Sequence, residues 1–184
     1  MATAPKPASQ DVDRTCGELD DYRVCVEEMR QRGSVTDGFN TTNAGNGAVF
    51  LMVRVSIASD KKSSTNLAWT MFELRDSSGE AWAPDNDAQA SAMLGGLRTI
   101  ELEQVHPGTT TSGWLVYYVP RSALSTLKMR FKPGVVRSID LALPPGPACA
   151  ASGKRGFCID AAHCSGIKVS GLCEGPSTVQ CCIQ

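Results

Sequence analysis

The C-terminal end of the chain concentrates its cysteines. Six of the eight cysteines lie in the last 36 residues, with the spacing C-x8-C-x5-C-x8-C-x7-C-C. They are Cys149, Cys158, Cys164, Cys173, Cys181 and Cys182. Thiols at this density either bind metal or form disulfides. Zinc sites favour ligand pairs two residues apart, usually with histidine, and this spacing has no such gap. The pattern therefore predicts three disulfides, no metal and an oxidising compartment.

Cys16 and Cys25 are the remaining two cysteines, with eight residues between them. Cys25 falls on the polar face of a predicted strand, so a bridge to Cys16 would attach the N-terminal segment to the outside of the domain. In the chain-entropy treatment, closing a loop of about ten residues is worth roughly 2.5–3 kcal/mol. We expect this pair to be a structural disulfide.

The chain has few residues of the types that carry out catalysis. The chain has only two histidines, His106 in a Pro-Gly turn and His163 beside a cysteine. A catalytic triad needs one of them near a nucleophile and a carboxylate, and no Gly-x-Ser-x-Gly motif supplies the nucleophile. Both histidines are therefore expected to be surface or turn residues, and the protein is not expected to be an enzyme.

Oxygen-ligand and carboxylate sites are also weakly supported. Asp85-Asn86-Asp87 could hold calcium, but the segment lacks the further acids and the glycine turn of a known loop, so an ordinary solvated turn is favoured. A carboxylate pair for glycoside cleavage depends on its separation in space, and no motif suggests one. No glycine-rich phosphate loop is present, and no cofactor is expected.

Aromatic side chains offer a possible sugar-stacking surface. The candidates are Trp69, Trp82, Trp114, Tyr117 and Tyr118. Tryptophan in a β-sandwich is more often core, and Trp114, Val116 and Tyr118 share one face of a strand, as core residues do. Trp82 lies beside a proline and a polar turn and is the expected exception.

The charge of the chain limits its partners. The formal net charge is −1, so no basic surface is available to displace counterions from nucleic acid or to bind anionic lipid. No segment approaches the roughly 20 apolar residues of a membrane helix. Met1–Gln10 lacks an apolar signal region, so Met1 is expected to be an artificial start that follows removal of a signal peptide. Asn40-Thr41-Thr42 is a glycosylation sequon, relevant only in a eukaryotic secretory path.

Short strands separated by turns fill the middle of the chain. They are expected over residues 22–27, 48–58, 71–76, 80–83, 97–105, 113–120, 127–131 and 135–143, with loops at 38–47 and 63–68. The 48–58 segment is nearly continuous and β-branched, which is typical of a central strand. Helical periodicity is almost absent. The pattern predicts an all-β fold, an antiparallel β-sandwich.

Composition divides the chain into four parts. Residues 1–15 are expected to be a flexible lead-in, 16–143 the sandwich, 144–148 a proline-rich linker and 149–184 a small disulfide-rich module. Three prolines in four residues favour an extended spacer. Within the module, Lys154, Arg155 and Lys168 against two acids give a charge of +1. Its apolar groups are too many for a small module to hide fully, so some are expected to face the sandwich or a partner.

The module resembles known cystine-rich folds. Its cysteine order and terminal Cys-Cys are similar to β-defensins and to a shortened clip domain. This likeness implies the pairs Cys149–Cys181, Cys158–Cys173 and Cys164–Cys182, whereas sequence alone leaves 15 connectivities open. Val169-Ser-Gly-Leu-Cys-Glu-Gly-Pro-Ser-Thr-Val-Gln-Cys-Cys also resembles a small module of secreted, largely fungal, peptidoglycan-degrading enzymes. There the fourth cysteine is commonly followed by Pro, where this chain has Glu174.

The sandwich resembles an immunoglobulin-like domain of unknown function found in bacterial lipoproteins and secreted antigens. The segments that carry the likeness are Ala48-Val-Phe-Leu-Met-Val-Arg-Val, Phe72-Glu-Leu-Arg-Asp-Ser-Ser-Gly and Gly113-Trp-Leu-Val-Tyr-Tyr-Val-Pro. That family has no catalytic motif, so the resemblance implies a fold and a location rather than an activity.

These observations predict a secreted or cell-surface, non-enzymatic binding protein whose module associates with cell-wall glycan such as peptidoglycan. The candidate binding residues are Trp82, Lys154, Arg155, Phe157 and Lys168. The alternatives are a protein-binding inhibitor or accessory subunit of a secreted enzyme, a defensin-like antimicrobial, and a hydrolase. Glycan binding predicts a groove with exposed aromatic and polar groups, whereas a protein partner predicts a contiguous apolar patch.

Overall fold

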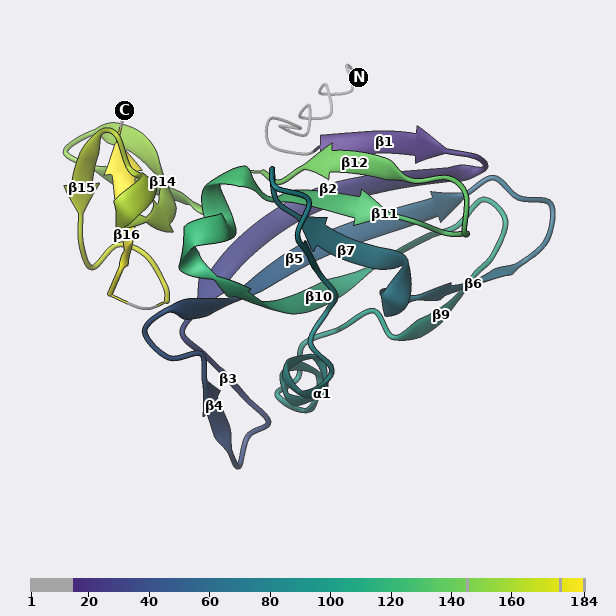
Figure 1. Cartoon of the computed structure of the whole chain (residues 1–184), viewed down its shortest axis with the longest axis horizontal. Coiled ribbons are helices and arrows are strands. Elements are labelled where there is room, and N and C mark those ends of the chain that lie inside the picture. Colours follow the sequence, from purple (N-terminus) through teal and green to yellow (C-terminus); the bar gives the residue numbers. More distant parts are fainter. Residues whose placement is uncertain (1–14, 145, 176, 184) are drawn as a thin grey trace, which may run out of the picture.

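Two four-stranded antiparallel sheets pack face to face and form an immunoglobulin-like β-sandwich (Figure 1). The computed structural model describes residues 15–144, 146–175 and 177–183. The first sheet, in the order β1-β2-β5-β10, contains β1 (Thr15–Leu19), β2 (Tyr22–Arg32), β5 (Ala48–Ser59) and β10 (Thr110–Pro120). The second, β12-β11-β7-β8, contains β7 (Phe72–Arg75), β8 (Ala81–Trp82), β11 (Lys128–Phe131) and β12 (Ile139–Ala142).

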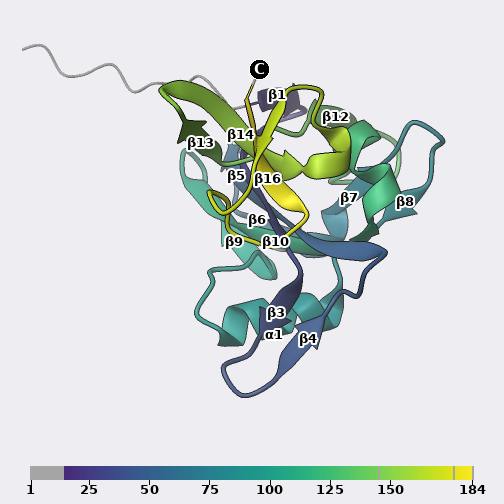
Figure 2. The same ribbon diagram turned by 90° about the vertical axis from the view of Figure 1, so that its left-hand side faces the viewer.

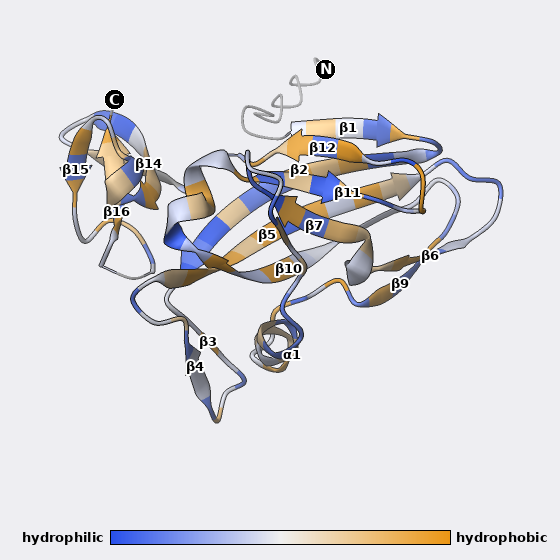
Figure 3. Ribbon diagram, in the orientation of Figure 1, coloured by the Kyte–Doolittle hydropathy of each residue, from blue (hydrophilic) through white to orange (hydrophobic). Residues whose placement is uncertain are grey.

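Strand β5 is buried on both faces, which explains its nearly continuous apolar sequence. Its alternate residues from Val49 to Ile57 point into the core between the sheets. Phe50 and Met52 point the other way, into a second and smaller core. Hydrophobic residues accordingly gather along the central strands in Figure 3, whereas the C-terminal half of β2 is hydrophilic.

The second core lies beneath α1 (Asn86–Leu94) and the hairpin of β3 (Ser34–Thr36) and β4 (Thr41–Asn43). The sequence showed almost no helical periodicity, and α1 was not predicted. Asp85, expected in a solvated turn, is the N-cap of α1, because its carboxylate accepts a hydrogen bond of 2.8 Å from the Ala88 N–H. Trp114 and Val116 are core residues, as predicted, but Tyr118 is 46% exposed and its hydroxyl donates to the Ala44 carbonyl.

Several other boundaries differ from the prediction. The expected 63–68 loop contains β6 (Thr65–Ala68), which pairs with β9 (Leu102–Val105), the only strand within the expected 97–105 segment. Residues 132–138 precede β12 and expose Val135 and Val136 fully. The described residues also form three short 3-10 helices: η1 (Trp69–Met71), η2 (Arg121–Thr126) and η3 (Ala161–His163).

The C-terminal module is a third four-stranded sheet, in the order β13-β14-β16-β15 (Figure 2). Its strands are β13 (Ala148–Ala151), β14 (Lys154–Asp160), β15 (Ile167–Val169) and β16 (Val179–Ile183). Three disulfides cross it, with the pairing that the resemblance implies: Cys149–Cys181, Cys158–Cys173 and Cys164–Cys182. The fourth disulfide, Cys16–Cys25, joins β1 to β2.

The strands that follow the expected lead-in and the expected linker each begin one residue earlier than predicted. Thr15, placed in the lead-in, already belongs to β1, and the rest of the lead-in lies outside the described residues. Ala148, placed in the linker, already pairs with Phe157 in the module sheet. The linker also packs closely, because a Cβ on Gly146 would lie 1.9 Å from the Cys158 carbonyl.

Candidate functional site

The module sheet presents two different faces, and the strand register assigns its side chains to them. Phe157 and Lys168 both stand opposite Cys182, so these three residues share one face. Arg155, two residues before Phe157, lies on the same face. This outward face is defined by Arg155, Phe157, Ile159, Lys168, Gln180 and the Cys164–Cys182 bridge.

The opposite face carries the other two disulfides of the module and points toward the sandwich. The sulfurs of Cys149, Cys158 and Cys173 lie within 4.8 Å of one another, close enough to suggest a metal site. Each is already bonded to another cysteine sulfur. A metal ligand must be a free thiolate, so this cluster is structural.

Arg121 joins the sandwich to this inward face. Its Nη1 lies 2.7 Å from the Asp160 carboxylate and 2.7 Å from the Thr178 hydroxyl. Asp160 is buried and also accepts the N–H of Ala162 at the start of η3. A buried charge is tolerated only when it is paired and hydrogen-bonded, so Arg121 holds the module in a defined orientation.

A second contact lies at the end of β2. Arg32 pairs with Glu174 of the loop before β16, at 2.5 Å between Nη2 and Oε2. Gly175 follows with φ at 122°, and a Cβ there would lie 2.6 Å from the Gln31 carbonyl. Only glycine permits both this backbone conformation and this close approach.

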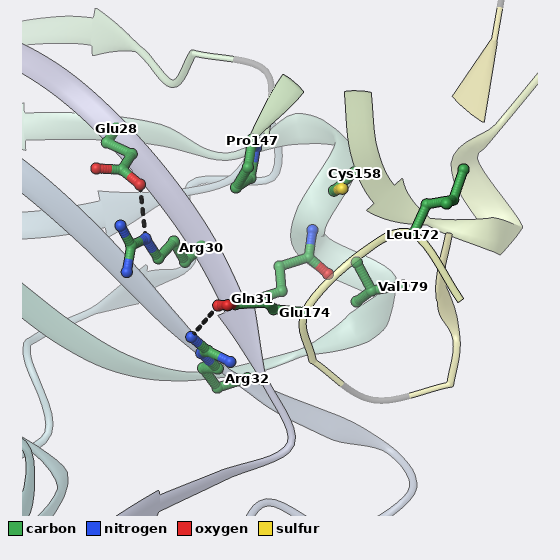
Figure 4. A pocket seen from close by; sticks show the side chains of 9 residues that line it. All are labelled: Glu28, Arg30, Gln31, Arg32, Pro147, Cys158, Leu172, Glu174 and Val179. Atoms are coloured by element: carbon green, nitrogen blue, oxygen red, sulfur yellow. Dashed lines mark hydrogen bonds and ion pairs between the residues drawn. The ribbon is translucent and has the colours of Figure 1, made fainter. Parts of the chain in front are cut away.

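Between these contacts lies a groove with a volume of about 300 Å³ (Figure 4). It forms where β2 extends past the end of its pairing with β1 at Val26. We call it the β2–module groove; it is lined by Glu28, Arg30, Gln31, Arg32, Pro147, Cys158, Leu172, Glu174 and Val179.

Two arginines and two glutamates give the groove balanced charge. Arg30 Nε donates to Glu28 at 2.6 Å, and the Arg30 guanidinium lies 4.8 Å from the centre of the Trp114 ring. The Gln31 amide points from β2 toward Cys158 and Val179 of the module (Figure 4). Gln31 is only 6% exposed, and among the described residues its Oε1 has no hydrogen-bond partner.

The structure brings together only part of the predicted binding set. Arg155, Phe157 and Lys168 share the outward face of the module, with Phe157 half-buried and the two cations exposed. Lys154 is exposed, but strand alternation places it on the other face. Trp82 stands opposite Leu74, packs against the sandwich core and lies in a different sheet.

The histidines lie at the surface. His106 Nδ1 is 2.7 Å from the Ser64 hydroxyl, and both residues are exposed. Within the described ranges, no carboxylate bonds to this pair. His163 ends η3 and is also exposed.

Sequence reasoning missed Gln31, Arg32 and Arg121. Arg30-Gln31-Arg32 reads as the polar end of a strand, and Arg121 follows the Pro120 that ends β10. Their roles depend on module residues more than 30 positions away. No local pattern could have identified them.

The sequence of residues 18–139 matches a family described as a domain of unknown function, DUF4352. The chain belongs to this family. The match covers most of the sandwich and ends before the module, whose likeness to defensin, clip and fungal modules stays a prediction. No curated protein matches the chain.

Solved structures share the fold of this DUF4352 chain. A conserved hypothetical protein from Bacillus anthracis aligns over 71% of this chain and 93% of its own, with 17% identity and a TM-score of 0.51. A presumed lipoprotein, ycdA, from Bacillus subtilis aligns over 68% of this chain and 37% of its own, with 12% identity and a TM-score of 0.52. At these identities the similarity shows the β-sandwich alone. None of the helices in the described ranges is long and apolar enough to cross a membrane.

Proposed function

We propose that this chain is a secreted or cell-surface binding protein without enzymatic activity, and that it attaches to cell-wall glycan through the outward face of its module. The location is supported by four disulfides, which persist in oxidising compartments. The ycdA structure, described as a presumed lipoprotein, is consistent with a surface location. The absence of enzymatic activity is proposed because Ser64 and His106 have no carboxylate partner among the described residues.

The observation that carries the glycan proposal is the composition of the outward face. Phe157 offers a ring for stacking on a sugar, and Arg155 and Lys168 flank it with hydrogen-bond donors. The Arg121–Asp160 contact and the narrow β2–module groove lie on the inward face, so the outward face is the more open surface for a polymer. The Cys164–Cys182 bridge fixes it before binding, which reduces the entropy lost on association.

The charge of the module supports an anionic polymer as the ligand. The two acidic side chains of the module are Asp160 and Glu174, and each pairs with an arginine of the sandwich. Lys154, Arg155 and Lys168 form no ion pair among the described residues and are exposed. The surface that the module offers to a ligand is therefore more basic than its sequence charge indicates.

Co-sedimentation with insoluble peptidoglycan and with chitin tests the proposal. We expect the wild-type protein to be retained, and Phe157→Ala and Arg155→Ala to reduce retention about tenfold each, the loss expected for one good contact. Arg98→Ala, an exposed arginine of the sandwich, is the matched control and should bind normally. Retention no greater than that of an unrelated β-sandwich would contradict the proposal.

A protein-binding role is the second candidate, because the sandwich exposes an apolar patch. Leu94 and Leu102 are 66% and 73% exposed. Leu102 also lines a hollow of about 380 Å³ with Met93 and Leu97, and Arg98, Glu101 and Glu103 form its charged rim. Such patches mark interfaces, here for an inhibitor or accessory subunit of a secreted enzyme. The immobilised protein would then retain a secreted hydrolase, and Leu102→Glu would abolish retention while leaving glycan binding intact.

A further inference from the structure

We propose that the β2–module groove binds the free carboxylate end of a short peptide. The groove is separate from the outward face, so this inference does not depend on glycan binding. Its volume of about 300 Å³ lies within the range of small-molecule sites. Such sites combine apolar walls with a few convergent polar groups. Here Pro147, Leu172 and Val179 supply the walls, and β2 supplies the polar groups.

Gln31 is the first sign of a missing ligand. Its side chain is almost fully buried, yet Oε1 has no hydrogen-bond partner among the described residues. Buried carbonyl oxygens are nearly always paired, because leaving one unpaired costs free energy. Oε1 is closed to solvent in this structure, so a ligand N–H reaches it, and removes this cost, when the Gln31 amide turns toward the groove. The amide of Gln31 has the same groups as a peptide bond and can bond a peptide backbone in either orientation.

Arg32 and Glu174 are the second sign. The Glu174 carboxylate pairs with the Arg32 guanidinium. The Glu174 side chain is 78% exposed, whereas the Arg32 side chain is 32% exposed, so the acid is the more mobile partner. Only Nη2 of Arg32 contacts Glu174, whereas a guanidinium can bind a carboxylate through two parallel hydrogen bonds. Glu174 therefore occupies the position that a ligand carboxylate would take and can swing into solvent when one arrives.

The charge balance of the groove selects a peptide over a phosphate. Glu28 and Glu174 face the same space as Arg30 and Arg32, and two carboxylates repel a dianion more strongly than a single carboxylate. Glu28 holds Arg30 through Nε, and the Arg30 guanidinium lies over the Trp114 ring. Arg32 and Gln31 project to opposite faces of β2, so a peptide end that satisfies Arg32 with its carboxylate and Gln31 with an N–H lies across the edge of β2 that β1 leaves free.

Isothermal titration with acetyl-Ala-Ala and its C-terminal amide tests the proposal, with the L,L and D,D forms run separately. We expect the free acid of at least one form to bind and its amide to bind at least tenfold more weakly. Equal binding of acid and amide, or no binding of either acid, would overturn the proposal.

Variants of the groove locate the site. Arg32→Gln should weaken acid binding at least tenfold, and Gln31→Leu should weaken it while the protein stays folded. Glu174→Gln should tighten binding severalfold, because it releases Arg32, and this exposed position leaves the fold unaffected. Glu101→Gln, an exposed glutamate of the sandwich, is the matched control. Phe157→Ala should not change peptide binding. An unchanged affinity in both Arg32→Gln and Glu174→Gln would exclude the groove.

Discussion

Gln89 replaces a missing strand at the edge of β10. Its Oε1 accepts the Val116 N–H at 2.8 Å, and its Nε2 donates to the carbonyls of Ile100 and Trp114. The side chain is buried. An edge strand otherwise presents unpaired backbone groups to other chains. Gln89 covers this edge of the first sheet together with the backbone of residues 98–100 and the Asp85 N–H.

Gln89→Leu should lower the free energy of unfolding by about 2–6 kcal/mol, because it leaves two buried backbone groups unpaired at roughly 1–3 kcal/mol each. Urea unfolding followed by tryptophan fluorescence measures the loss. Gln104→Leu, at an exposed position of β9, should change stability by less than about 0.5 kcal/mol. Equal stability of the two variants would show that Gln89 does not seal the edge.

The Arg130–Asp140 pair makes stability depend on acid pH. Arg130 donates two hydrogen bonds to the Asp140 carboxylate, at 2.6 and 2.8 Å, and they lower the pKa of Asp140 below its usual value of 3.8. The pKa of Asp140 is therefore lower in the folded protein than in the unfolded chain. The ion pair stabilises the fold at pH values above the unfolded pKa, and this stabilisation is lost as the pH falls through the folded pKa.

Asp140→Asn should therefore destabilise the protein at pH 7 and have little effect at pH 2. The side chain is 41% exposed, so the difference at pH 7 should stay within about 1 kcal/mol. Urea midpoints at both pH values measure it, with Asp21→Asn at an exposed turn as control. A loss of equal size at both pH values would exclude the ionised pair as its cause.

At the scale of elements, the module depends on one buried ion pair for its orientation. Arg121→Gln leaves the buried Asp160 without its cation, and breaking such a pair costs on the order of 3–5 kcal/mol. We expect the cost to appear as loosening of the module, because Asp160 lies in β14. Hydrogen exchange of β14 and β16 should accelerate while β5 and β10 stay protected. Arg137→Gln, whose partner Asp20 lies on the sandwich surface, is the control. Unchanged exchange in β14 would contradict this role.

The elements also show where sequence patterns succeed. Strands β5 and β10 were predicted because they are long and their apolar residues leave no other interpretation. Helix α1 was missed because it buries Ala88, Gln89 and Ala92. Two alanines and a glutamine form no apolar stripe, and only Asp85 marked the helix start. The short strands β4 and β6 were predicted as loops, and β3 was not predicted, because tertiary pairing, rather than composition, makes these segments strands.

In the whole molecule, the β2–module groove forms only where the module packs against the sandwich. The cysteine spacing predicted the module, and the prolines before it predicted a linker, but neither predicted how the two parts contact each other. The groove itself needs Arg32 of β2 and Glu174 of the module, which are 142 residues apart. It also needs β1 to be shorter than β2. Neither condition leaves a local pattern in the sequence. Three residues of the outward face, Arg155, Phe157 and Lys168, could therefore be proposed from sequence, but the groove could not.

The two parts of the molecule should respond differently to reductant. The sandwich has a large apolar core and one disulfide, whereas the module buries few apolar side chains and has three disulfides. Small domains with little core depend on such bridges. Under dithiothreitol without denaturant, we expect the module to unfold while the sandwich persists.

Hydrogen exchange with mass spectrometry measures this separation. Protection should disappear from β14 and β16 and remain in β5 and β10, and peptide binding in the groove should be lost at the same time. An oxidised sample carried through the same steps is the control. If the sandwich unfolds together with the module, then the Arg121–Asp160 contact couples the two parts into one cooperative unit, and the module cannot be described as an independently stabilised attachment.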